Sequence, residues 1–86
     1  MNTDAATIVG LFAGFLTTAA FVPQVLKIWT SRSARDVSLP AFAALTLGVA
    51  GWLVFGILKQ DPPIILWNAV TLLLAGAILV MKVRFG

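Results

Sequence analysis

The amino-acid sequence predicts an all-α membrane protein, a bundle of three transmembrane helices in which residues 1–86 form a single domain. The composition supports this class, because 60% of the residues are hydrophobic and 10% are charged, whereas charged residues make up about a quarter of a soluble domain. The charges also avoid residues 5–26, 37–58 and 62–81. Each uncharged stretch is long enough to cross a hydrocarbon core about 30 Å thick as a helix.

The first helix is expected from Ala5 to Trp29 and contains a proline in its second half. We do not interpret it as a cleaved signal peptide, because its flank carries Asp4 instead of a basic residue and its apolar stretch is too long. Pro23 has no N–H for the carbonyl of Ala19, which costs about 3 kcal/mol inside a soluble helix. The cost is smaller in a membrane, where neighbouring groups can satisfy that carbonyl. The proline therefore predicts a packed kink or a hinge.

The second and third helices are expected from Leu39 to Leu58 and from Pro62 to Lys82. Ser38 precedes the second helix and Asp61 the third, and in both cases proline follows in the first turn. A polar cap followed by proline favours a helix start. Both connections are short, so consecutive helices should run antiparallel and pack as one unit.

Small and polar side chains within the helices suggest how they pack. Gly10 and Gly14 form a small-xxx-small step, which lets helices approach closely in lipid and which we interpret as a packing surface. Trp67 is interpreted as packing or as part of the interfacial aromatic belt. The threonines within the helices can bond carbonyls of their own helices, so they are weak evidence for a pore. They are Thr17, Thr18, Thr46 and Thr71.

The basic residues predict the orientation in the membrane. Lys27, Arg32 and Arg35 follow the first helix, Lys82 and Arg84 follow the third, and Lys59 is alone on the opposite side. The positive-inside rule therefore places the first loop and the C-terminus in the cytoplasm and the N-terminus outside. The net charge of +3 is explained by this topology and gives no reason to expect a nucleic-acid partner.

Several function classes are excluded by the residues that the chain lacks. It has no His or Cys, and its three carboxylates, Asp4, Asp36 and Asp61, lie at or beyond the ends of the apolar stretches. We therefore expect no enzyme activity, cofactor or metal site. A proton-coupled carrier normally holds a titratable group within the membrane, and a phosphate-cradling glycine loop would be needed for ATP use. A transported solute should therefore move down its own gradient, although sodium coupling through backbone carbonyls stays open.

Trp52 and Asn68 are the candidate binding residues. At 1.5 Å per residue, both lie about 10 Å below the outer ends of their helices, so one pocket could contain both. An indole face can cover the apolar face of a sugar ring, while a primary amide bonds adjacent hydroxyls. The alternative is that Trp52 fills a gap in the core and Asn68 bonds another helix.

The sequence resembles the bacterial SemiSWEET transporters, which belong to the PQ-loop group, and the resemblance covers essentially the whole chain. The residues that carry it are the run FVPQVLKIW at Phe21–Trp29, then Val37-Ser38-Leu39-Pro40, with Trp52 and Trp67-Asn68 downstream. The resemblance implies a three-helix bundle of spatial order 1-3-2 and a parallel homodimer around a central pathway. It further implies a uniporter of neutral mono- or disaccharides that works by alternating access in the bacterial cytoplasmic (inner) membrane.

The resemblance also assigns roles to individual residues. Trp52 and Asn68 match the substrate-binding pair of the family, and Pro23 and Gln24 match its hinge. Gln24 could either satisfy the carbonyl that Pro23 leaves free or contact a neighbouring helix. Val49 stands where some relatives have a small polar residue, which bears on the size and preference of the sugar.

Gates are expected at both ends of the pathway. Lys59 and Asp61 could pair across the dimer axis at the outer mouth, or they are simply solvated loop charges. Phe42 could plug the inner mouth beside Pro23, or it faces lipid. Two other functions remain open, a carrier of another small solute such as an amino acid or organic cation, and an accessory or assembly membrane protein.

Overall fold

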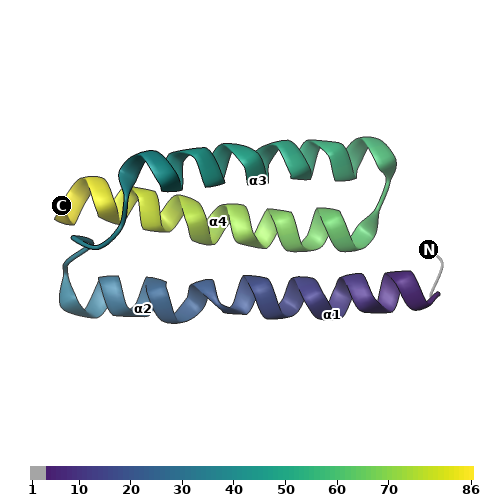
Figure 1. Ribbon diagram of the computed structural model, residues 1–86, viewed down its shortest axis with the longest axis horizontal. Helices are drawn as coiled ribbons and strands as arrows, with labels where there is room; N and C mark the ends of the chain where they lie inside the picture. The colour runs from purple at the N-terminus through teal and green to yellow at the C-terminus, as the bar shows by residue number, and fades with distance from the viewer. Residues whose placement is uncertain (1–3) are drawn as a thin grey trace.

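The computed structural model describes residues 4–86, so residues 1–3 of the predicted domain lie outside the described range. The helices are α1 (Ala5–Ala19), α2 (Phe21–Ser31), α3 (Leu39–Lys59) and α4 (Pro62–Phe85). Figure 1 shows them as long, nearly parallel rods, with α1 and α2 following one another along a single line. Ala5–Ser31, α3 and α4 are each long and apolar enough to cross a membrane, which confirms the three predicted spans.

The first predicted helix is interrupted once. Ala20 separates α1 from α2 but keeps φ −63° and ψ −22°, so the two segments remain nearly collinear. The interruption follows Ala19, whose carbonyl would have received the N–H that Pro23 lacks. The expected helix Ala5–Trp29 is therefore corrected to two segments, the second of which ends at Ser31.

The predicted starts of α3 and α4 are confirmed. The Ser38 hydroxyl accepts the Ala41 N–H at 3.3 Å, and the Asp61 carboxylate accepts the Ile64 N–H at 3.4 Å. Proline occupies the first turn of both helices, where its missing N–H costs little. The ends were predicted slightly short, since α3 reaches Lys59 and α4 continues beyond Lys82 to Phe85.

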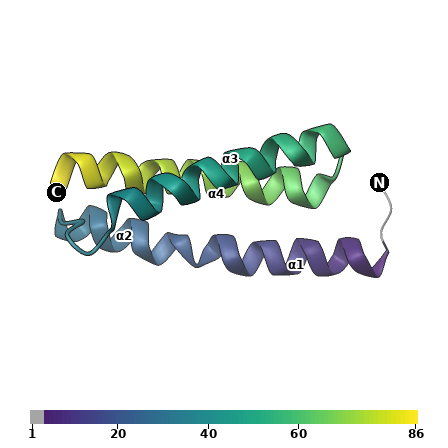
Figure 2. The same ribbon diagram turned by 45° about the horizontal axis from the view of Figure 1, so that its top comes forward.

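Within residues 4–86, α4 is the one helix that packs along all the others, which confirms the spatial order 1-3-2. It lies between α3 and the line formed by α1 and α2 (Figure 1), and α3 crosses in front of it in the turned view (Figure 2). The short turn between α3 and α4 makes those two helices antiparallel neighbours. The longer loop of residues 32–38 carries the chain from α2 past the end of α4 to α3.

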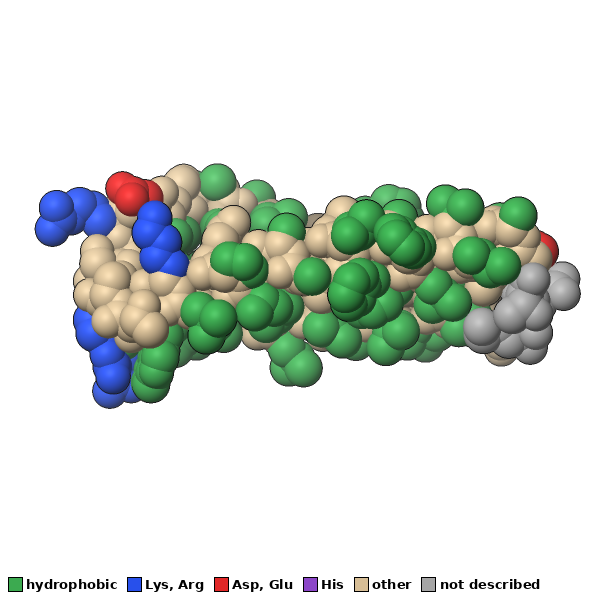
Figure 3. All heavy atoms as spheres, turned by 90° about the horizontal axis from the view of Figure 1, so that it is seen from below, with side chains coloured by type: hydrophobic (Ala, Val, Ile, Leu, Met, Phe, Trp, Pro, Cys, Tyr) green, Lys and Arg blue, Asp and Glu red, His purple; other side chains and the backbone are tan. Residues whose placement is uncertain are grey.

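The buried core lies toward the end of the bundle that holds this loop, and we call it the loop core. Its members are Ile28 of α2, Ala34 of the loop, and Ile78 and Met81 of α4. Most other large apolar side chains point outward, as Figure 3 shows for one face. An exposed apolar belt is what a lipid environment requires, and in lipid the close packing of side chains replaces the hydrophobic effect as the source of stability.

Candidate functional site

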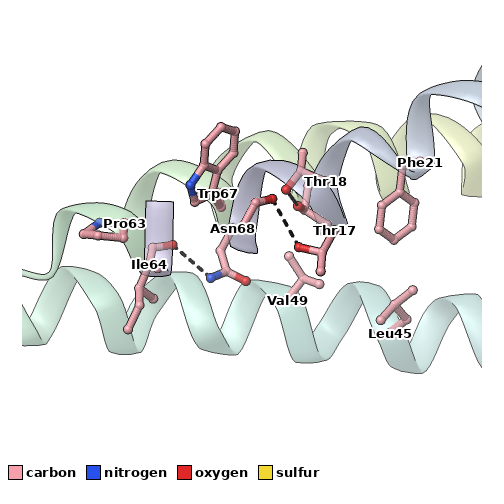
Figure 4. A pocket seen from close by; sticks show the side chains of 12 residues that line it. Thr17, Thr18, Phe21, Leu45, Val49, Pro63, Ile64, Trp67 and Asn68 are labelled. Atoms are coloured by element: carbon pink, nitrogen blue, oxygen red, sulfur yellow. Dashed lines mark hydrogen bonds between the residues drawn. The ribbon is translucent and has the colours of Figure 1, made fainter. Parts of the chain in front are cut away.

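A cavity of about 350 Å³ lies between α1, α3 and α4, toward the end of the bundle that lies opposite the loop core. The residues that line it are uncharged. Its polar side chains are Asn68 and three threonines, Thr17, Thr18 and Thr71. Figure 4 shows Asn68 projecting from α4 toward Val49 of α3. The setting suits a neutral solute, because a charged one would be buried without a counter-charge.

Asn68 is fixed by its own helix. Its amide nitrogen donates to the Ile64 carbonyl at 2.9 Å, and its oxygen lies on the side of Val49 (Figure 4). The alternative expectation is that Asn68 forms a hydrogen bond to another helix. The structure shows its amide bonded to its own helix instead. Val49 is 8% exposed and forms the opposite wall. One amide N–H and the amide oxygen thus remain available at a wall that is otherwise mainly apolar.

Trp52 lies outside this cavity within a single chain. It lines a separate shallow hollow on α3 with Gly48, Gly51 and Phe55, and its ring packs edge-on against Phe55 at 5.3 Å between centroids. The side chain is 57% exposed, so it does not fill a gap in the core. The structure therefore brings Val49 and Asn68 together and leaves Trp52 on a neighbouring, uncovered surface.

Helix α1, the first half of the first span, is held against α4 by two contacts that border the cavity. The Trp67 ring fits against Gly14, where a Cβ would overlap it, so Trp67 serves in packing. The hydroxyls of Thr18 and Thr71 lie 2.8 Å apart and join α1 to α4. Thr18 is 4% exposed and Thr71 is half-buried, so this polar link between the helices is partly buried.

The link between Thr18 and Thr71 corrects the expectation that threonines bond their own helices. That expectation holds for Thr17, whose hydroxyl donates to the Gly14 carbonyl at 3.1 Å. It also holds for Thr46, whose hydroxyl donates to the Phe42 carbonyl at 2.7 Å. Sequence position alone does not separate the two kinds of threonine. The cross-helix pair depends on the depth at which α1 and α4 meet.

The Pro23-Gln24 pair lies in the first turn of α2, directly after the interruption at Ala20. Gln24 is exposed and lines a second cavity, beneath the loop of residues 32–38. No side-chain hydrogen bond within residues 4–86 joins its amide to the Ala19 carbonyl, so the first of its two expected roles is absent from this conformation.

The residues expected at the gates lie at opposite ends of the bundle. Phe42 packs edge-on against Phe21 at 6.2 Å between centroids and contacts the loop core, so it is not simply a lipid-facing side chain. Lys59 is the last residue of α3, and Asp61 caps α4. No ion pair forms between these two charges within the described chain.

The described residues contain no cluster of His, Cys, Asp or Glu able to hold a metal ion. The buried Nε1 of Trp67 is a polar side-chain atom without a hydrogen-bond partner. It lies against Gly14, so close packing accounts for its position.

Comparisons with known proteins agree with this architecture. Residues 5–65 match the family model described as PQ loop repeat. A protein of Bradyrhizobium diazoefficiens named sugar transporter SemiSWEET is 52% identical over 92% of this chain and 92% of its own length. A protein of the same name from Leptospira biflexa is 44% identical over 92% of this chain and 93% of its own length.

Two solved structures share the arrangement of the helices. A bacterial homologue of SWEET transporters superposes with a TM-score of 0.90 and 42% identity, covering 96% of this chain and all of that one. A SemiSWEET in the inward-open conformation superposes with a TM-score of 0.85 and 35% identity, covering 95% of this chain and 88% of that one.

Proposed function

Because the chain belongs to the PQ-loop family and to its SemiSWEET members, we propose that it carries a neutral sugar across the membrane as a uniporter. The observation that carries the proposal is the uncharged cavity at Asn68, found in a chain whose relatives are named sugar transporters. An uncharged wall with one amide can bind a mono- or disaccharide and still release it. The relatives are not enzymes, and this function requires no cofactor.

The working unit in this proposal is a parallel homodimer. One chain leaves Trp52 in a shallow hollow apart from Asn68, and a second copy facing the first would cover both. Two indoles and two amides would then surround one substrate, with Val49 setting the width of the space. The half-cavity of about 350 Å³ is at the small end of ligand sites, which fits a pocket completed by a partner.

Alternating access would follow from bending of the first span at the Ala20 interruption, where Pro23 has freed a carbonyl. Phe42, beside Phe21, would close the inner mouth. Lys59 and Asp61 would pair across the axis when the outer mouth closes. The protein would reside in the bacterial cytoplasmic membrane with its N-terminus outside and its C-terminus in the cytoplasm, as the basic residues predict.

The test is uptake into proteoliposomes with ion gradients dissipated, using neutral sugars and amino acids as separate substrates. Wild-type protein should take up a sugar and no amino acid. Trp52→Ala and Asn68→Ala should lose uptake while the protein still elutes as a dimer. Trp29→Ala is the matched control, because this exposed tryptophan at the loop end lies outside the cavity.

Three results would contradict the proposal. Wild-type uptake rates in both Trp52→Ala and Asn68→Ala would remove the site assignment. Uptake of amino acids in place of sugars would leave a PQ-loop carrier with another substrate. Absence of any flux, together with stable association with another membrane protein, would favour the accessory role.

A further inference from the structure

Five basic residues gather at the loop end of the bundle: Lys27, Arg32, Arg35, Lys82 and Arg84. Figure 3 shows the blue side chains of this group at one end of the apolar belt. The Lys82 ammonium already has a partner within the chain, since its Nζ donates to the Ala34 carbonyl at 3.0 Å. Arg32 already makes cation–π contacts, because its guanidinium lies 4.2 Å from the Trp29 ring centroid and 5.4 Å from that of Phe85.

Two of the other basic residues, Lys27 and Arg35, line one cavity of about 390 Å³ beneath the loop. Within residues 4–86 neither forms an ion pair with a carboxylate, although Asp36 also lines the cavity. The cations come from different elements, Lys27 from α2 and Arg35 from the loop. The cavity therefore carries two unpaired positive charges against one negative charge.

The uncharged walls add further donors. Ser33 Oγ accepts the Arg35 N–H at 3.4 Å, which leaves its own hydroxyl hydrogen available. The Gln24 amide lines the same space and supplies two N–H groups. Ser31 contributes less, because its hydroxyl already donates to the Lys27 carbonyl at 2.7 Å.

From this geometry we propose that the cavity binds a phosphate group. A guanidinium and an ammonium beside a hydroxyl and an amide form a donor set that matches phosphate oxygens. Trp29 and Arg32, stacked at the same end, place the cavity at the level of the membrane interface, where lipid phosphates lie. The phosphate comes from the headgroup of an anionic phospholipid or from a soluble phosphate monoester, and one experiment separates the two sources.

The experiment measures binding of phosphatidylglycerol to the purified full-length protein by native mass spectrometry, with phosphatidylcholine as the reference lipid. Removal of each cation, by Lys27→Gln or Arg35→Gln, should weaken phosphatidylglycerol binding about fivefold, and the double variant should lose about 25-fold. Arg84→Gln is the matched control, because Arg84 lies at the same end but outside the cavity. Asp36→Asn should strengthen binding, a gain that misfolding cannot mimic.

The source is decided by adding glycerol phosphate or inorganic phosphate as competitor. A lipid site predicts that phosphatidylglycerol binds and that millimolar soluble phosphate does not displace it. Displacement by soluble phosphate, lost in the double variant, assigns the site to a phosphate monoester. The proposal fails if Lys27→Gln/Arg35→Gln binds phosphatidylglycerol and soluble phosphate as wild type does, or if Asp36→Asn weakens binding. Sugar uptake plays no part in this readout, so the result stands apart from the transport proposal.

Discussion

Gly14 gives the sharpest test of how α1 meets α4. A Cβ built at this position would overlap the Trp67 ring, with Nε1 at 2.8 Å and two carbons of the ring closer still. The overlapping atoms belong to the inner edge of the indole, so the whole ring must move. Gly14→Ala should therefore be destabilising, although alanine is the better helix former.

The magnitude follows from two opposing terms. Overpacking costs about 1 to 3 kcal/mol, and the severe overlap at Gly14 places this site near about 3 kcal/mol. The better helix propensity of alanine returns about 1 kcal/mol. The free energy of unfolding of Gly14→Ala should thus fall by about 2 kcal/mol.

The assay is reversible unfolding in mixed micelles, followed by tryptophan fluorescence, at fixed protein concentration. Gly76→Ala is the control, because a Cβ there has no neighbour within 4 Å, and Gly10→Ala is the graded comparison, because its Cβ would lie 3.4 Å from Pro63 Cβ. Neither control should lose stability. If Gly14→Ala were as stable as Gly76→Ala, the close packing of the Trp67 ring against Gly14 would be refuted.

Three further changes test the bond between Thr18 and Thr71, the hinge at Pro23 and the cap of α1 at Asp4. Thr18→Val should lower the free energy of unfolding by about 0.6 to 1.7 kcal/mol, while Thr18→Ser should keep the bond to Thr71 and most of the stability. Pro23→Ala should restore a continuous first helix and slow sugar exchange, which spin-label distances and uptake together would measure; unchanged transport with the interruption still present would contradict the hinge. The Asp4 carboxylate accepts the Thr7 N–H at 2.8 Å, and this bond lowers the pKa of Asp4 below its ordinary value of 3.8. The stability that Asp4 adds over Asp4→Ala should therefore be present above pH 3.8 and disappear as the pH falls through the lowered pKa, and a difference that persisted in full at lower pH would contradict this.

The spans and helix starts could be predicted because their signals are local. Uncharged stretches identify the membrane helices, and Ser38 and Asp61 cap them through N–H groups only three residues away. The interruption at Ala20 follows equally directly from the missing N–H of Pro23. The order 1-3-2 had a different basis, since short connections predict antiparallel neighbours and the family resemblance supplied the order.

The candidate site was less predictable because it depends on which helices meet and at what rotation. Equal depth suggested one pocket for Trp52 and Asn68, but Trp52 lies on a different part of the α3 surface from Val49. The bond between Thr18 and Thr71 needs a register between α1 and α4 that no local pattern specifies. A helical repeat gives the direction of a side chain and leaves its partner undetermined.

The two halves of the first span are held against α4 by different kinds of contact. Before Ala20, α1 is held by the close packing of Trp67 against Gly14 and by the partly buried bond between the hydroxyls of Thr18 and Thr71. After it, α2 itself packs through apolar side chains such as Ile28, and the polar contacts to α4 at this end, from Lys82 to the Ala34 carbonyl and from Arg32 to Phe85, begin only at the residues that follow α2. Lipid tails can replace apolar contacts at little cost, whereas a close notch and a hydrogen bond are lost when the helices separate. We therefore infer that α2 is the half that moves against α4, with α1 and α4 travelling together. Spin labels should show a broader range of α2–α4 than of α1–α4 distances, and the reverse result would place the moving part above the proline.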